Sequence, residues 1–584
     1  MRPGIYRKAW IGTLLVLTCS LVMSEGGRAQ AASAFGTTAS AESAQTIPGV
    51  PWPVFTAKSE TDAHMLVVCV QFAGQKAIKP LSVYRQIYFG KTGSVADYYR
   101  QVSFGQFQLS GVVVGDPMHP SQYLQLPHTE AYYAGKDNGT GSPYPHDDDQ
   151  LVADVIYQLI ADHFNFIPYE TDGQLPYLAI VYSGYGADVE PGDANLIWPV
   201  EDSFNAPVAV PLPGGTATKE KDLMITNYDL VPELDMTDEA PTIGVFAHEL
   251  GHLLGLDDLY DTSGAVNAGE GDGPWSLMAT GNWNGYPQGA QPAELDPWSR
   301  ILLGWINPIV IRESVTGLRV PPIEQEPVVY ELAPVGGGAL PWDVQPSSGT
   351  GAKRRSTTSK ATSSQAPNDF FLIDNVQSLS FDRGLPESGV MIWHIDGREA
   401  LPGSYDYLNN VLNAPSQNKT HHYDEQVIEA GGTNVLQEPS SDVGVLDDTY
   451  PSSAGNDRFT GSSHPSNRLW DGQSVGISLS HIAVGKDGTA TMDVLDDQTG
   501  RALTIMRPET GLVVTEGTRV PLVAREWNGQ HWLDVTDTVT WRSGSQGEGV
   551  YLLGNEMTCK RPGFVTIEAK DGSLTALLVV QVIA

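Results

Sequence analysis

The chain has 584 residues, of which 69 are acidic and 34 basic, giving a formal net charge of −35. This charge argues against nucleic acids and anionic membrane surfaces as partners. An apolar content of 41% excludes a disordered chain, and the length predicts several domains at roughly 150 residues each.

The N-terminus has the composition of a bacterial export signal. Basic residues precede an apolar run over 9–23, which is too short to span a bilayer comfortably. Cleavage is expected at 29–31, with 32–34 as a second candidate, and an uncleaved membrane anchor is the alternative. We therefore predict a signal peptide over 1–31, a leader or short pro-segment over 32–61, and a secreted, extracellular protein without stable membrane insertion.

Residues 62–310 alternate predicted strands with predicted helices, as in an α/β or α+β domain. Apolar runs and helical spacing predict three strands and two helices, over 65–72, 109–114 and 177–182, and over 94–100 and 149–164 respectively. An acidic run at 147–149 suits the N-terminus of the second helix, whose dipole favours negative charge. A Ca²⁺ loop is the alternative for this run.

A further helix is predicted to begin within 237–243, where a capping residue, acids and a proline occur together. Gly255 is expected to end it. This helix carries His248-Glu249-Leu250-Gly251-His252. Two histidines four residues apart share one face and can bind one Zn²⁺ ion, while Glu249 can act on a metal-bound water.

The third zinc ligand is predicted to follow the helix. Gly255 lets the chain turn back, and Asp258 then lies six residues after His252, where a folded-back ligand would sit. The alternative is Asp257. A structural Ca²⁺ ion is a further expectation, held by nearby acids: Asp257, Asp261, Glu270 and Asp272.

A helix is predicted at 296–305, and the rest of the chain is predicted to be largely β-structure. Strands are predicted at 328–332, 370–373, 390–395, 427–428 and 477–484, forming a β-rich domain over 311–500 with a flexible insertion at 346–367. An immunoglobulin-like β-sandwich is predicted over 503–584, with strands at 504–506, 512–514, 519–524, 539–542, 549–552, 563–568 and 574–582. Cys69 and Cys559 fall in different predicted domains, so free thiols are expected.

The motif from His248 to Asp258 resembles the elongated zinc-binding motif of metzincin-type peptidases, with Asp in place of the usual third His. With Leu259-Tyr260-Asp261 and 273–281, it resembles the immune inhibitor A family of secreted metallopeptidases. The resemblance extends over 62–495 and includes four further segments, 94–105, 179–186, 370–375 and 389–396. It implies a zincin-like α/β (α+β) catalytic domain over 62–310 followed by β-sandwich-type domains. It also places Met278 in the turn beneath the zinc.

The expected function is that of a secreted zinc endopeptidase acting on protein or peptide substrates. Zinc would be held by His248, His252 and Asp258, and Glu249 would move the proton from the attacking water to the leaving amine. The immunoglobulin-like tail, which resembles bacterial immunoglobulin-like domains, could bind a surface or polymer. The alternative is an extracellular binding or adhesion protein with an inactive metallopeptidase core.

Overall fold

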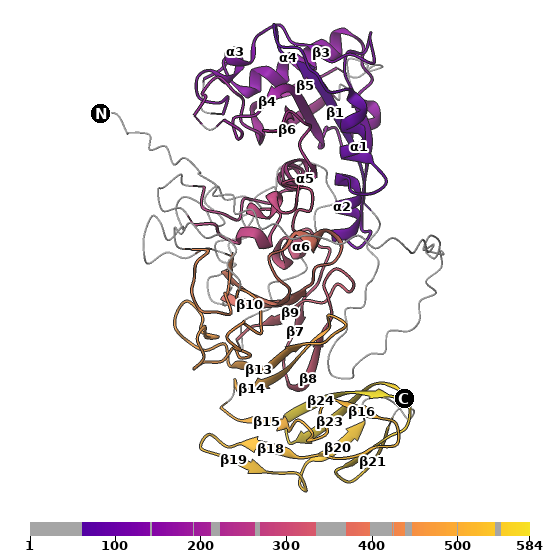
Figure 1. Cartoon of the computed structure of the whole chain (residues 1–584), viewed down its shortest axis with the longest axis vertical. Coiled ribbons are helices and arrows are strands. Elements are labelled where there is room, and N and C mark those ends of the chain that lie inside the picture. The colour runs from indigo at the N-terminus through magenta and orange to yellow at the C-terminus, as the bar shows by residue number, and fades with distance from the viewer. Residues whose placement is uncertain are drawn as a thin grey trace, which may run out of the picture. The chain divides into compact units, whose positions relative to one another are not determined.

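The chain divides into the units Met1–Gln45 and Thr46–Ala584, and every described residue belongs to the second. The computed structural model describes residues 61–140, 143–190, 192–211, 222–262, 269–334, 369–396, 423, 425–437, 447–498, 500–543 and 550–584 (Figure 1). The predicted signal peptide, nearly all of the leader and the predicted insertion at 346–367 lie outside these residues. No described helix is long and apolar enough to cross a membrane.

A mixed sheet forms the first part of the described chain, in the order β2-β1-β4-β6-β5. Its neighbours pair in parallel except β5, which is antiparallel to β6, and a short strand β3 adds to β1. The strands are β1 (Thr61–Gln71), β2 (Phe107–Val114), β3 (Leu124–Gln125), β4 (Leu178–Tyr185), β5 (Val200–Val210) and β6 (Leu223–Leu234). The three strands predicted here are confirmed as β1, β2 and β4.

Helices cover both faces of this sheet. They are α1 (Leu81–Phe89), α2 (Val95–Val102), α3 (Glu130–Ala134), α4 (Asp148–Ala161) and α5 (Ile243–Leu253). Successive strand side chains point to opposite faces. Accordingly, Met65 and Val67 of β1 pack in one core with α1, α2 and α5, whereas Leu66 and Val68 pack in a second core with α4. Helix α5 therefore lies on the face that also carries α1 and α2.

The ends of the predicted helices are partly confirmed. Asp147 caps α4 by accepting a hydrogen bond from the Gln150 amide, and Asp148 and Asp149 occupy its first turn, as expected of an acidic helix start. The predicted start of α5 is wrong in one respect. Its N-cap is Thr242 and its first turn holds no acid, so the acids before Pro241 precede the helix. Gly255 ends α5 in the left-handed conformation with φ 93°.

A five-stranded sheet follows the short helix α6 (Pro297–Leu302), in the order β12-β11-β10-β9-β7. Its strands are β7 (Ile309–Val310), β9 (Tyr330–Leu332), β10 (Asp369–Val376), β11 (Gly389–Asp396) and β12 (Glu425–Val427). The strands predicted from 328 to 428 are confirmed. Every residue of β10 and β11 is buried, which agrees with their continuous apolar runs.

A seven-stranded sheet joins segments that the sequence analysis assigned to different domains. Strand β24 (Leu574–Ile583) pairs in parallel with β8 (Ser314–Val320), with Ala576 opposite Ser314. The other strands of this sheet are β13 (Ile477–Val484), β14 (Ala490–Asp496), β16 (Val513–Thr515), β20 (Thr540–Ser543) and β23 (Gly563–Asp571). The sheet thus runs across the predicted boundary near residue 503, which the sequence did not anticipate.

Two three-stranded sheets complete the C-terminal segment. They are built from β15 (Ala502–Ile505), β18 (Ala524–Trp527) and β19 (Trp532–Asp534), and from β17 (Arg519–Pro521), β22 (Glu556–Cys559) and β21 (Val550–Leu553). The single strand predicted over 519–524 is therefore wrong, because this segment contains β17 and the start of β18. Cys69 and Cys559 are both free and buried, as predicted. The mixed α/β, multi-sheet class is confirmed, whereas the zincin-like assignment and the β-sandwich tail stay predictions.

Candidate active site

Helix α5 carries the polar side chains of the candidate site and is itself part of the hydrophobic core. Almost all of it is buried, because Phe246, Ala247 and Leu250 pack into the same core as α1 and α2. His248 and Glu249 are themselves buried, at 5% and 6% exposure. Buried polar groups are costly unless they have partners, so the surroundings of these two residues define the site.

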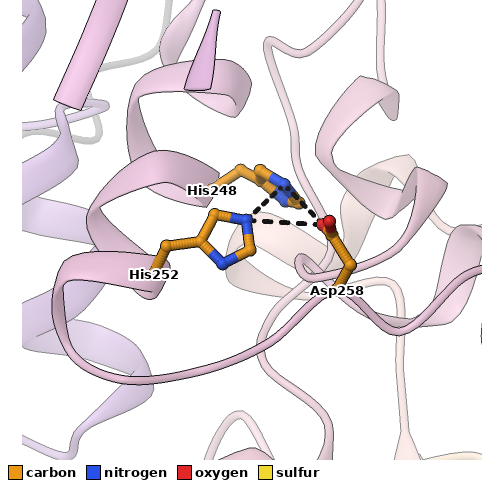
Figure 2. Close-up of side chains that lie close together, drawn as sticks. All are labelled: His248, His252 and Asp258. Carbon is orange, nitrogen blue, oxygen red and sulfur yellow. Dashed lines mark hydrogen bonds and ion pairs between the residues drawn. The ribbon is translucent and has the colours of Figure 1, made fainter. Parts of the chain in front are cut away.

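His248, His252 and Asp258 converge on one point (Figure 2). The two Nε2 atoms are 3.1 Å apart. Asp258 Oδ1 lies 3.2 Å from Nε2 of His248 and 3.3 Å from Nε2 of His252. The three atoms form a nearly equilateral triangle. Asp257, the alternative third ligand, is exposed and is not part of this group.

Backbone carbonyls fix the orientation of both rings. His248 Nδ1 lies 2.9 Å from the Leu277 carbonyl oxygen, and His252 Nδ1 lies 2.8 Å from that of Leu256. A carbonyl only accepts, so each Nδ1 donates and each Nε2 of a neutral ring carries a free lone pair. Carbonyl partners of this kind set the tautomer of metal-binding histidines. The free lone pairs are those that face Asp258.

The triangle fits a tetrahedral metal ion. Two ligands at the usual Zn–N or Zn–O distance of about 2.05 Å from a tetrahedral centre lie about 3.3 Å from each other, close to the three distances observed. Asp258 Oδ1 is buried and makes no hydrogen bond, which leaves it available to a cation. Two imidazoles and one carboxylate are also a ligand set that zinc uses in catalytic sites, with a fourth position open.

Charge within the triangle also favours a cation. Burial alone would lower the pKa of His252, but Asp258 and Glu249 raise it to about 10. Burial would raise the pKa of Asp258, yet the two histidines hold it below its ordinary value. A proton is therefore the competitor for this position, and metal binding would release it.

Glu249 lies among carboxylates that sequence reasoning missed. Burial raises its pKa, and the two histidines of the motif oppose that rise. Asp229 on β6 is fully buried, and its pKa is raised well above its ordinary value by burial and by the charges of Glu249 and Glu201. Burial, together with the charge of Glu249, raises the pKa of Glu201 on β5 to about 7. Strands β5 and β6 are not predicted by the sequence, so these neighbours could not be found from it.

Met278 packs against helix α5. Its side chain is fully buried, and a Cβ atom added at Gly251 would lie 2.5 Å from Met278 Sδ. The thioether therefore contacts the helix at Gly251, next to His252. The Met278 carbonyl also accepts a hydrogen bond from the Leu259 amide at 2.8 Å, which joins this loop to the segment carrying Asp258.

Tyr260 is a further neighbour that the sequence analysis did not assign. Burial raises the pKa of its hydroxyl, and the charge of Asp258 raises it further. Tyr260 follows Asp258 by two residues, and its ring packs against the core that holds α5. The hydroxyl is therefore close enough to Asp258 to feel its charge.

Comparison with known proteins places the site in a metallopeptidase-type catalytic domain. Residues 80–304 match the family described as immune inhibitor A peptidase M6, catalytic domain. The resemblance to the immune inhibitor A family seen in the sequence is therefore confirmed over this segment.

Two relatives show how far the similarity extends. The pre-pro-metalloprotease PrtV of Vibrio cholerae serotype O1 is 28% identical over 242 residues, covering 37% of this chain and 24% of the relative. Immune inhibitor A of Bacillus thuringiensis subsp. alesti is 29% identical over 236 residues, covering 36% of this chain and 31% of the relative. In both cases the matched part is less than two thirds of the relative's own length.

Proposed function

We propose that the chain is a secreted zinc-dependent endopeptidase that hydrolyses peptide bonds in protein substrates. The proposal rests chiefly on the triangle formed by two Nε2 atoms and Asp258 Oδ1, with sides of 3.1, 3.2 and 3.3 Å. It is supported by the peptidase M6 match over the segment that holds this triangle. His248, His252 and Asp258 are proposed as the metal ligands and Glu249 as the catalytic residue.

Zinc in this position would polarise the scissile carbonyl and lower the pKa of a bound water towards about 7. Glu249 takes a proton from the attacking water and passes it to the leaving amine. Its buried position suits this role, because burial favours the neutral carboxylic acid and so eases proton uptake. The Leu277 and Leu256 carbonyls hold the imidazoles in place while Met278 supplies an apolar floor.

Secretion and the nature of the C-terminal segment are part of the proposal. The basic and apolar N-terminus supports export. An immunoglobulin-like β-sandwich is supported by a separate core in which β15, β17, β18, β22, β23 and β24 all take part. Such a tail could bind an extracellular surface or polymer.

Casein hydrolysis by the purified chain tests the proposal. We expect zinc-dependent cleavage that stops with a chelator, returns with zinc, and is lost in Glu249→Ala. Metal analysis should find zinc in both proteins. A zinc-loaded wild type that cleaves neither casein nor gelatin would contradict the enzymatic proposal and favour a binding protein with an inactive core.

The choice of third ligand has its own test. We expect Asp258→Ala to lose zinc and activity, because it removes one corner of the triangle. Asp257→Ala should retain both, since Asp257 is exposed and outside the group. Loss of zinc from Asp257→Ala alone would overturn the assignment.

A further inference from the structure

A cluster of three buried carboxylates forms a second group of possible metal ligands, separate from the histidine site. It comprises Asp272, which precedes the 3-10 turn Gly273–Trp275, Asp296, which caps α6, and Glu425, the first residue of β12. One oxygen from each lies within 4.8 Å of the other two. Their exposures are 0%, 1% and 0%. Residues more than 150 positions apart thus bring three acids together away from water.

Asp272 is the member whose surroundings call for a ligand. Both of its carboxylate oxygens are buried, and neither makes a hydrogen bond with any residue that the structure describes. Asp296, by contrast, accepts from Ser276 Oγ at 2.8 Å and from the Ser299 amide at 2.6 Å. A buried ionised carboxylate is stable only when it is paired or coordinates a metal, so Asp272 needs a cation or a proton.

The described groups that act electrostatically on Glu425 include Asp296, Asp272 and Asp374, and Asp296 also acts on Asp272. All of them are carboxylates. The buried Arg300 on α6 pairs with Glu294 at 2.8 Å. A divalent cation would neutralise charge that these carboxylates otherwise concentrate.

The donor set identifies the class of cation. All three ligands are carboxylates, which hard cations prefer, and among the described residues no histidine or cysteine joins them. Their oxygens lie within 4.8 Å of one another, so one Ca²⁺ ion at its usual Ca–O distance of about 2.3–2.6 Å can reach all three. The ligand set differs from the His–His–Asp triangle, which suits zinc.

The cluster is joined to the histidine site by two short hydrogen-bonded paths. The Asp272 amide donates to the Leu259 carbonyl at 2.9 Å, next to Asp258. Ser276 Oγ, which donates to Asp296, also accepts from the Met278 amide at 3.1 Å. The loop between these points carries the Leu277 carbonyl that orients His248.

We propose that Asp272, Asp296 and Glu425 form a structural Ca²⁺ site that holds the loop bearing Leu277 and Met278 in place. The sequence predicts Ca²⁺ near Asp257, Asp261, Glu270 and Asp272, whereas in the structure Asp272 groups with Asp296 at the start of α6 and Glu425 on β12. The part of the proposal that concerns zinc binding rests on the proposed function, whereas the Ca²⁺ site stands without it.

Calcium binding by the full chain tests the site directly. With zinc held constant, equilibrium dialysis against Ca²⁺ followed by metal analysis should show one Ca²⁺ ion fewer in Asp272→Asn than in wild type. Ca²⁺ should raise the melting temperature of wild type more than that of Asp272→Asn. Glu331→Gln is the matched control, because Glu331 is also a buried acid with an unpartnered oxygen but lies on β9, outside the cluster.

Terbium luminescence gives a readout that needs no variant to fold. Trp275 and Trp298 are buried three and two residues after Asp272 and Asp296, so excitation of tryptophan should sensitise Tb³⁺ bound at the cluster. We expect a signal in wild type that millimolar Ca²⁺ displaces. Absence of this signal in wild type, or full calcium stoichiometry in Asp272→Asn, would overturn the site.

Zinc affinity tests the link between the two sites. We expect zinc to bind about 10-fold to 100-fold more weakly in Asp272→Asn or without Ca²⁺, as for loss of other groups that support metal ligands. Unchanged zinc affinity together with loss of one Ca²⁺ would overturn the link and leave the Ca²⁺ site. Failure of casein cleavage with normal Ca²⁺ binding would count against the proposed function alone.

Discussion

At the scale of single residues, the site depends on groups that touch the proposed ligands and not the metal itself. Leu277 and Leu256 orient the two imidazoles through their carbonyl oxygens. Tyr260 lies close enough to Asp258 for the charge of that carboxylate to raise the pKa of its hydroxyl, and we expect this hydroxyl to support Asp258 in the same way. Partners of this kind raise metal affinity by fixing the ligands before the metal arrives, so their loss should be seen in metal binding.

Tyr260→Phe should therefore weaken zinc binding about 10-fold or more, because Asp258 loses a nearby hydroxyl that we expect to orient it. Competition with a coloured zinc chelator measures the change. Tyr450→Phe is the control, since its hydroxyl is buried without a hydrogen-bond partner in another core. Equal zinc affinity in Tyr260→Phe and wild type would show that this hydroxyl has no supporting role.

Glu249→Gln should separate chemistry from metal binding. The amide keeps the size of the side chain but cannot accept the proton of the attacking water, so turnover should fall about 10²-fold to 10⁴-fold. Zinc content should be unchanged, because Glu249 is not part of the triangle. Steady-state cleavage of a fluorogenic peptide with parallel metal analysis checks this. A variant that loses zinc would indicate a structural role instead.

At the scale of elements, the close contact between α5 and the loop of Met278 controls the geometry. Gly251 permits it, because a Cβ there would meet Met278 Sδ at 2.5 Å and Cε at 3.1 Å. At Gly244, the second residue of α5, an added Cβ would lie 1.9 Å from the Asn282 carbonyl oxygen. Two glycines thus let the helix approach the segment that follows the motif.

Gly251→Ala should consequently destabilise the protein by about 1–3 kcal/mol and lower activity, since Met278 must move. The double variant Gly251→Ala/Met278→Leu should recover part of the loss, because residues in contact are not additive. Gly461→Ala serves as the control, as its added Cβ would meet nothing closer than 3.5 Å. Denaturant unfolding and peptide cleavage measure both effects; strict additivity in the double variant would refute the contact.

Sequence patterns predict the helices and strands whose apolar side chains repeat regularly. They do not predict strands that carry functional polar residues or that form only by pairing with distant segments. The HExxH helix, its glycine stop and the position of Asp258 followed from spacing. Strand β6 could not be predicted in this way, because it lies between β4 and β5 yet contains Asp229 and Pro232. A buried acid and a proline argue against a central strand. Asp229 lies there beside Glu249, so the departure from the pattern occurs at the site itself.

The sequence predicts only one member of the carboxylate cluster formed by Asp272, Asp296 and Glu425. Asp272 could be named as a candidate Ca²⁺ ligand because acids gather near it in the sequence. Asp296 and Glu425 could not, since only the fold brings the start of α6 and the start of β12 to Asp272. The position of Asp258, the proposed third metal ligand, was easier to predict because a single glycine turn links it to the helix.

At the scale of the whole molecule, β24 ties two cores together. Leu577 and Val579 pack in the core that contains β8 and β10, whereas Leu578 and Val580 pack in the core of the C-terminal strands. The alternation follows from the two faces of a strand. The segment over 503–584, which the sequence predicts to be a separate domain, therefore supplies side chains to the β-rich part before it.

Leu577→Ala and Leu578→Ala should each cost about 2–5 kcal/mol and should both shift the unfolding of the β-rich part. Calorimetry of the full chain checks this, with Leu553→Ala as an exposed control. If Leu577→Ala shifts only a transition assigned to the C-terminal strands, then the two cores unfold independently and β24 does not couple them.

Buried acids predict how stability depends on pH. Burial, opposed by Arg312, raises the pKa of Glu331 to about 7, and burial raises that of Glu130 to about 8. Each acid keeps its proton in the folded chain at a pH where the unfolded chain has lost it. Their contribution to the free energy of unfolding is thus complete below about pH 4.5 and falls as pH rises through the folded pKa.

We therefore expect the melting temperature to decrease between pH 5 and pH 8 at low salt and without added Ca²⁺. Glu331→Gln should flatten part of this decrease, because glutamine does not titrate. The high net negative charge acts in the same direction, since self-repulsion grows as acids ionise. A melting temperature that rises over this pH range would contradict the prediction.

The pairing of β8 with β24 has a consequence for the order in which the chain can fold. Both neighbours of β8 in its sheet, β14 and β24, come much later in the sequence; the second is separated from it by roughly 260 residues. During synthesis β8 must wait with both edges open, long after the peptidase segment has all of its own strands. A chaperone that shields open strand edges should therefore assist folding of the β-rich part more than folding of the segment over 80–304.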